Sequence, residues 1–337
     1  MSLVDVAHEA ESRGPFESIP MIDLQSVCNP DPAVRRNLAN HVRDVCINVG
    51  FLYLQNHGIP DKTIEDALTA SKSFFSLPLE KKLELDIRKT SNFKGFNPIL
   101  SSNNDPGNDG DFHEGFEFGW EEFNAKDHDD KRANDDVMAG ANVWPADLPN
   151  FREPVLKYYH AAVELGRKLF PVFAVALDLP EDFFANKTKN AAAIMRILHY
   201  PPQTGPVDDR IIGIGAHTEY YILHCFTILW QEPGIQALQV LNNQKQWVDA
   251  PPIPGTLVLN LGDQFARWTN DVFKSTVHRA INRSGVRRYS IPLFFGTDYD
   301  VKLEPIPSCV SEDLPAKYDV VTAGEYVKER LQAAYGH

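Results

Sequence analysis

Cysteine is scarce in this 337-residue sequence, and long apolar runs are missing. The four cysteines (Cys28, Cys46, Cys225 and Cys309) have no CxxC spacing, which favours reduced thiols in a cytoplasmic protein, although a bridge between two of them stays compatible. No stretch approaches the ~18 apolar residues that a membrane helix needs. The N-terminus is polar and acidic and lacks the apolar segment of a signal peptide. We therefore expect a cytoplasmic protein with no membrane partner.

Basic residues are also few. Lysine and arginine total 33 against 46 aspartates and glutamates, so the formal net charge is −13. Nucleic-acid binding requires a basic face, and membrane-surface anchoring requires a polybasic segment. The composition disfavours both classes and leaves a small molecule as the expected partner.

Most of this negative charge comes from one segment. Between Asp105 and Asp136 there are twelve acidic residues and three basic ones, a local net charge of −9. The simplest interpretation is a solvated surface loop, but four aromatic residues lie inside it. These could form a lid over a pocket or serve only as packing. Phe116 is the one that we consider as a substrate contact; the others are Phe112, Phe118 and Trp120.

The N-terminal half predicts a mixed α/β region. We expect a loose arm over the first ~20 residues. We also expect a helix with Asp31 as its N-cap and Pro32 as its first residue, which runs up to Gly50. A strand at 51–55 and a second helix from Asp61 follow. This gives three divisions: a mixed region at 1–100, the acidic loop and potential lid at 101–150, and a catalytic core at 151–337.

From residue 191 onward the sequence pattern is typical of a β protein. Eight short β-rich runs alternate with Gly, Pro and Asn turns at intervals of ~8–12 residues, which indicates an antiparallel sandwich or barrel. A long helix at about 154–177 precedes them, and an amphipathic helix ends the chain. The fold class is therefore α+β, mainly β: a jelly-roll core with a helical and mixed α/β N-terminal region.

The strongest chemical signal is His217-Thr218-Glu219, because residues i and i+2 of a strand share one face. A third ligand could come from His278, in another strand-like run. Two histidines and a carboxylate form the facial triad of non-haem Fe(II) oxygenases. They also suit a Zn²⁺ hydrolase. An isolated HxE would usually be coincidence, so its neighbours decide its meaning.

An anion-binding pattern accompanies this triad. Arg288 and Ser290 lie on one face of a strand, and an arginine that points into a barrel is costly unless it meets an anion. Its planar fork matches a carboxylate, and Ser290 can donate a further bond. Tyr200 could offer its hydroxyl to the same group.

With these motifs in their order, the sequence resembles the isopenicillin-N-synthase-like class of 2-oxoglutarate/Fe(II)-dependent dioxygenases, in its fungal and bacterial branch. The resemblance covers roughly residues 17–330. It implies a double-stranded β-helix, Fe(II) held by His217, Glu219 and His278, and 2-oxoglutarate held by Arg288 and Ser290 with help from Tyr200. It implies oxidation of a small organic molecule with O₂, by hydroxylation, desaturation or cyclisation, with release of succinate and CO₂. The matching runs include VGFLYLQNHGIP, MRILHYPP, GIGAHTE, KSTVHRA and RRYSIPLFF.

Two departures from the family pattern leave room for a different activity. Glu219 stands where the family usually has Asp, and YYILH after it adds about three residues. The added run is either a bulge or widened turn, or it brings Tyr221 or His224 into the substrate pocket beside the metal site. Arg267 is a further candidate substrate contact, with a salt bridge as its alternative role. The chain could instead be an ethylene-forming variant that acts on 2-oxoglutarate itself, or a catalytically weak small-molecule-binding homologue. The sequence leaves the oligomeric state open; we favour a monomer.

Overall fold

The computed structural model describes residues 3–11, 14–103, 110–123, 140–202, 212–218 and 224–335. Its helices are α1 (Leu3–Glu11), α2 (Pro32–Asn48), α3 (Asp61–Phe75), α4 (Leu79–Leu83), α5 (Arg152–Ala176), α6 (Asp263–Trp268) and α7 (Ala323–Tyr335). Its first strands are β1 (Met21–Asp23), β2 (Phe51–Gln55), β3 (Gly95–Asn97), β4 (Glu114–Gly119) and β5 (Ala193–Tyr200). The later ones are β6 (Ile214–His217), β7 (Phe226–Gln231), β8 (Leu238–Leu241), β9 (Trp247–Asp249), β10 (Thr256–Leu261), β11 (His278–Ala280) and β12 (Arg288–Phe295).

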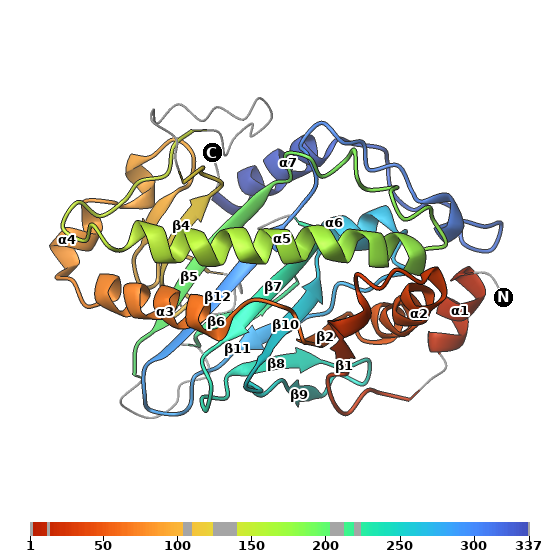
Figure 1. Cartoon of the computed structure of the whole chain (residues 1–337), viewed down its shortest axis with the longest axis horizontal. Coiled ribbons are helices and arrows are strands. Elements are labelled where there is room, and N and C mark those ends of the chain that lie inside the picture. The colour runs from red at the N-terminus through yellow and green to blue at the C-terminus, as the bar shows by residue number, and fades with distance from the viewer. Residues whose placement is uncertain are drawn as a thin grey trace.

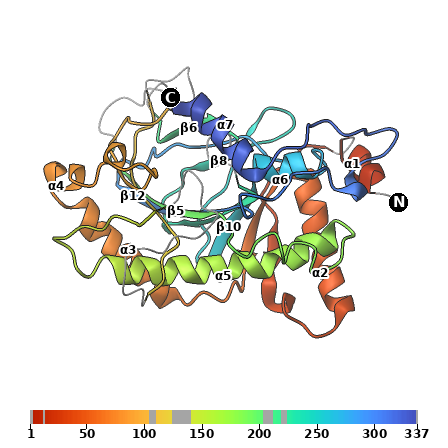
Figure 2. The same ribbon diagram turned by 90° about the horizontal axis from the view of Figure 1, so that it is seen from above.

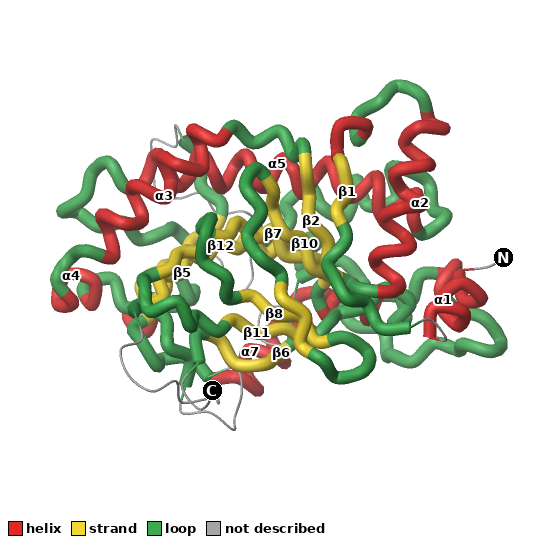
Figure 3. The backbone as a smooth tube through the Cα atoms, turned by 90° about the horizontal axis from the view of Figure 1, so that it is seen from below, coloured by secondary structure: helices red, strands yellow, loops and turns green. Residues whose placement is uncertain are grey.

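Two sheets form the core. The larger has eight strands in the order β1-β2-β10-β7-β12-β5-β4-β3, and the smaller has four in the order β6-β11-β8-β9. All the pairs are antiparallel except β1 with β2. Figure 3 shows β6, β8 and β11 grouped beside the larger sheet. This arrangement confirms the expected jelly-roll core with a mixed N-terminal region.

Helices cover the outer face of the larger sheet. α5 runs across the strands (Figure 1), and the view from above places the sheet between α5 and the smaller sheet (Figure 2). Apolar side chains of α2, α3 and α5 join those of the larger sheet in one buried core. Fifteen of the 25 residues of α5 are buried, because this helix packs against the sheet and against both other helices. Among the described helices, none is both long and apolar enough to cross a membrane.

Local signals set several boundaries. The Asp31 carboxylate accepts a hydrogen bond from the Ala33 N–H at 2.8 Å, so α2 begins where the N-cap predicts. After α2, Gly50 has a φ of +71°, a left-handed conformation that glycine adopts at little cost. At α7, Thr322 and Glu325 bond to each other's backbone N–H groups, as in a capping box.

Two expectations need correction. Residues 3–11 of the expected loose arm form α1, whose Leu3 and Val4 are buried. Within the segment expected as a loop at 101–150, Glu114–Gly119 is a fully buried strand of the larger sheet. The sequence pattern did not reveal this strand, because its glutamates are buried only with the help of cationic partners from distant elements. Residues 104–109 and 124–139 lie outside the described part, so the lid and the three-part division stay predictions.

Gly166 offers a test of the packing of α5. A methyl group there would lie 2.6 Å from Cδ2 of Phe295, whose ring stacks on Phe226. Alanine normally stabilises a helix by up to ~1 kcal/mol relative to glycine, but overpacking costs ~1–3 kcal/mol. We expect Gly166→Ala to lower the free energy of unfolding by about 1–2 kcal/mol in denaturant titrations. The exposed Glu164→Ala on the same helix should change it by less than ~0.5 kcal/mol. A stabilised Gly166→Ala variant would contradict this packing.

Candidate active site

A cavity lies between the two sheets, lined by alternate residues of their strands. On β5 the residues that face it are Arg196, Leu198 and Tyr200, and the alternate Met195 and Ile197 enter the helix-covered core. The smaller sheet contributes His217, His278 and several apolar groups. The remaining lining residues are Ile214, Thr227, Leu229, Leu238, Asn260, Arg279, Ala280, Arg288, Ser290, Pro292 and Phe294.

Strand pairing brings the two histidines together. β6 and β11 pair antiparallel with His217 opposite His278, and their ring centroids are 4.4 Å apart. Nδ1 of His217 is 2.7 Å from the Gly215 carbonyl oxygen, and Nδ1 of His278 is 3.1 Å from that of Thr276. A carbonyl only accepts, so each Nδ1 carries the proton and each lone pair is on Nε2. This is the orientation and tautomer of metal-binding histidines.

The segment before β4 holds β6 in place. Asp111 is fully buried, and its carboxylate accepts a hydrogen bond from the Gly215 N–H at 2.8 Å. His113 donates from Nδ1 to the Gly213 carbonyl at 2.9 Å, and burial lowers the pKa of this imidazole. Asp111 thus fixes the backbone N–H of Gly215, and the carbonyl of the same residue fixes His217. These contacts orient one member of the histidine pair.

Arg288 is a buried cation that lacks a carboxylate partner within the described part of the chain. Arg288 is 1% exposed, and its Nη2 donates a hydrogen bond to the side-chain oxygen of Gln231 at 3.2 Å. Among the described residues, its Nε and Nη1 have no hydrogen-bond partner. Ser290 and Tyr200 lie beside it, with their hydroxyl oxygens 3.5 Å apart. A buried guanidinium with unsatisfied donors is costly unless it meets an anion, so this end of the cavity fits a carboxylate.

The other residues expected at the site fall in different places. Glu219 and Tyr221 lie outside the described residues. His224 is buried behind the cavity wall, where its Nε2 lies 2.7 Å from the hydroxyl of Thr227, a lining residue. The described residues therefore bring together His217, His278, Arg288, Ser290 and Tyr200 around one cavity.

Phe116 belongs to the core. Its ring packs against Phe74 and Phe151 at centroid distances of 4.8 and 5.2 Å, on the helix-covered face of β4. It is not among the described residues that line the cavity. Since side chains alternate along a strand, the residue that follows it, Glu117, points to the cavity face.

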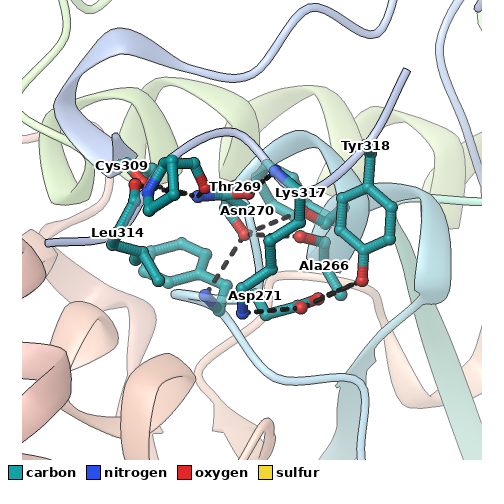
Figure 4. Close-up of polar contacts among 11 residues, drawn as sticks. Ala266, Thr269, Asn270, Asp271, Cys309, Leu314, Lys317 and Tyr318 are labelled. Atoms are coloured by element: carbon teal, nitrogen blue, oxygen red, sulfur yellow. Dashed lines mark hydrogen bonds and ion pairs between the residues drawn. The ribbon is translucent and has the colours of Figure 1, made fainter. Parts of the chain in front are cut away.

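Arg267 is engaged by the C-terminal segment. Its Nη2 donates to the Asp319 carbonyl at 2.6 Å, and its guanidinium carbon lies 4.9 Å from the Tyr318 ring centroid. The following turn holds the same segment, because Asn270 and Asp271 bond to residues between Cys309 and Tyr318 (Figure 4). Arg267 therefore contacts the C-terminal segment, and it is not among the described residues that line the cavity.

Comparisons with known proteins agree with this geometry. Residues 19–147 match a family described as the non-haem dioxygenase in morphine synthesis N-terminal region, and residues 191–297 match the 2OG-Fe(II) oxygenase superfamily. The 2-oxoglutarate-Fe(II) type oxidoreductase hxnY of Emericella nidulans is 37% identical, over 94% of this chain and 90% of that protein. The chain belongs to the 2-oxoglutarate/Fe(II)-dependent dioxygenase family.

Further relatives of this dioxygenase come from a comparison of sequences and from a comparison of solved structures. Homoarginine-6-hydroxylase 2-ODD-233 of Oryza sativa is 31% identical, over 94% of this chain and 97% of that protein. The crystal structure of a full-length Neurospora crassa protein in complex with alpha-KG and thymine superposes with a TM-score of 0.80 at 28% identity, covering 94% of this chain and 97% of that one. The dioxygenase is an oxidoreductase that uses Fe(II), 2-oxoglutarate and O₂ on a small organic molecule. These relatives do not favour a Zn²⁺ hydrolase, an ethylene-forming variant or a catalytically weak binding protein.

Sequence reasoning missed three polar residues that shape the site: Asp111, Glu117 and Arg196. A signal for two of them was present. In EGFEFG the aromatic residues at 116 and 118 mark one face, so Glu117 must occupy the other. Arg196 lies four residues before Tyr200 on the same strand, so the two side chains must lie on the same face of the sheet. Nothing in the sequence pairs Asp111 with Gly215, because that contact joins segments about one hundred residues apart.

A buried ion pair backs the cavity wall on its far side. The carboxylate of Glu114 lies 2.6 Å from Nζ of Lys82 and 2.8 Å from Nδ1 of His199, on the strand that carries Tyr200. The side chains of Lys82 and Glu114 are both buried. Glu114→Ala therefore leaves the Lys82 charge buried without its carboxylate partner. We expect the free energy of unfolding to fall by about 3–5 kcal/mol.

The control for Glu114→Ala removes both charges. The double variant Lys82→Met/Glu114→Leu should recover most of the stability, because apolar residues of similar volume replace the pair. Denaturant titration of the wild type and both variants measures this difference. If Glu114→Ala and the wild type had equal free energies of unfolding, the predicted cost of leaving Lys82 unpaired would be wrong.

Proposed function

We propose that His217, Glu219 and His278 hold Fe(II), and that Arg288, Ser290 and Tyr200 hold 2-oxoglutarate, in a dioxygenase that hydroxylates, desaturates or cyclises a small organic substrate. The observation that carries this proposal is the buried Arg288, whose unsatisfied donors share one cavity with the two paired histidines. Succinate and CO₂ are the co-products. Bound Fe(II) with 2-oxoglutarate supplies the activation of O₂ for this oxidation.

Each side chain then has a defined task. Arg288 would hold a carboxylate of 2-oxoglutarate, and the Ser290 and Tyr200 hydroxyls would donate further hydrogen bonds to it. Backbone carbonyls hold the Nδ1–H groups of His217 and His278, so that the Nε2 atom of each imidazole would be the metal ligand. Apolar neighbours such as Leu198, Leu229 and Pro292 exclude water from the reacting groups.

The surroundings of the protein are part of the proposal. We infer a monomer in a reducing, cytoplasmic setting without nucleic-acid or membrane partners. All four cysteines are unpaired, and three of them are buried, which suits a compartment where thiols stay reduced. A dimer in light scattering, or a disulfide found by mass spectrometry of non-reduced protein, would count against it.

The metal assignment predicts an optical signal. Anaerobic addition of Fe(II) and 2-oxoglutarate should give a weak visible charge-transfer band, and His278→Ala should lose it because one imidazole ligand is gone. Glu219→Asp should keep the band, since a carboxylate remains at this position. His160→Gln, at a histidine on α5, is the matched control and should keep it too. Absence of the band from both the wild type and Glu219→Asp would refute the assignment.

The Arg288 assignment predicts a separable defect. Arg288→Ala should weaken 2-oxoglutarate binding by about 30–1,000-fold, the loss expected for one partner of a buried charge pair. Calorimetry on the Mn(II)-loaded protein measures it, and the affinity for Mn(II) alone should not change. Arg36→Ala, at an arginine that pairs with Asp178 on the surface, is the control. Unchanged 2-oxoglutarate affinity in Arg288→Ala would contradict the role given to this residue.

A further inference from the structure

Three polar side chains meet on the inner face of β3, β4 and β5. Glu117 lies opposite Arg196 in the register of β4 and β5, and an oxygen of its carboxylate is 2.7 Å from a guanidinium nitrogen of Arg196. The same carboxylate oxygen accepts a hydrogen bond from Asn97 at 2.5 Å. The side chains of Glu117 and Arg196 are 6% and 13% exposed. This buried cluster is separate from the groups assigned to iron and 2-oxoglutarate.

Arg196 and Arg288, which both line the cavity from the larger sheet, differ in how their charge is balanced. Burial raises the pKa of Glu117, and the Arg196 charge and the Asn97 hydrogen bond act against that shift. The ion pair with Glu117, at 2.7 Å, gives Arg196 a counter-ion inside the protein. Among the described residues, Arg288 donates a hydrogen bond only to the neutral Gln231, so its counter-ion must come with a ligand.

Arg196 also lies at a distance from the Arg288 end. It is four residues from Tyr200 on β5, about 13 Å along the strand, whereas Tyr200 pairs directly with Arg288. The terminal carbons of a five-carbon diacid are only about 5 Å apart. A co-substrate that is held at Arg288 thus leaves the cavity near Arg196 for another molecule.

The surroundings of Arg196 define what that molecule can be. The Phe294 ring centroid is 5.7 Å from its guanidinium carbon, and Leu198, Leu229 and Pro292 line the same cavity. A guanidinium has five N–H donors in one plane, so an arginine that is paired with a carboxylate can still donate to a second acceptor. A second carboxylate there would be repelled by Glu117 at low dielectric, whereas a neutral acceptor would not.

Resting on the proposed function, we propose that Arg196 recognises the substrate. Glu117 neutralises the charge of Arg196 and holds it in position, and Asn97 in turn holds Glu117. The substrate is then a neutral molecule. It presents a carbonyl, amide or ring-nitrogen acceptor to Arg196, next to an apolar part that packs against Phe294. Glu117 sets this preference, because it excludes carboxylate-bearing molecules of the same shape.

The test compares a matched pair of probes, benzamide and benzoate, which differ in charge but share an apolar ring. Calorimetry on protein loaded with Mn(II) and 2-oxoglutarate, which cannot turn over, gives the ratio of their dissociation constants. The wild type should bind benzamide more tightly than benzoate. Glu117→Gln should shift this ratio toward benzoate by at least about tenfold, because it uncovers the Arg196 charge. Arg196→Gln should weaken both probes and show no gain for benzoate.

Two further variants keep the result decisive. Glu121→Gln changes a carboxylate on the same segment that pairs with Arg152, and it should leave the ratio unchanged. If Glu117→Gln does not fold, the double variant Glu117→Gln/Arg196→Gln, which carries no unpaired charge, should lose the wild-type preference. A ratio that is unchanged in the Glu117 variants, or a wild type that binds neither probe, would overturn the proposal.

A failure of the proposed function would look different. It would appear as unaltered 2-oxoglutarate affinity in Arg288→Ala, whatever the probe ratio is. Conversely, if Arg288→Ala loses 2-oxoglutarate while the probe ratio ignores Glu117, only the inference about the substrate fails.

Discussion

The antiparallel pairing of β6 with β11 is the constraint on which the site depends. It places His217 directly opposite His278, although the two strands are separated in the chain by several others. A slip of one residue would turn one imidazole to the other face of the sheet. The buried Asp111 carboxylate fixes β6 through the Gly215 N–H, so the register is held by a contact from outside the smaller sheet. The chemistry of the site thus begins with the backbone hydrogen bonds of two short strands.

The larger sheet separates two environments. One face packs on α2, α3 and α5, where Phe116 and Phe118 join the core. The other faces the cavity and carries the arginines, with Ser290 and Tyr200. Because neighbouring residues of a strand point to opposite faces, the same eight-residue strands stabilise the fold and build the site. Rigid strands therefore hold the polar groups at fixed positions, as binding of a small co-substrate requires.

Charge balance distinguishes the functions of buried cations. Lys82 and Arg196 each have a carboxylate partner within 2.7 Å, and Arg288 has none among the described residues. A paired cation is compatible with a structural role or with recognition of a neutral group, whereas an uncompensated one requires an anionic ligand. This difference is the reason why we propose Arg288 as the partner of 2-oxoglutarate and Arg196 as the partner of a neutral substrate.

The sequence by itself predicted the jelly-roll core and the N-cap of α2, because strand periodicity and capping are local properties. Its resemblance to known dioxygenases indicated the family and the set of candidate ligands. It could not place Phe116 or Arg267, since the face of a hidden strand and the docking of a distant C-terminal segment depend on long-range packing. Only the tertiary structure decided that Asp111 supports the strand of His217 and that Glu117 neutralises Arg196. Those contacts join segments that are far apart in the chain, and no local pattern specifies which buried charge meets which partner.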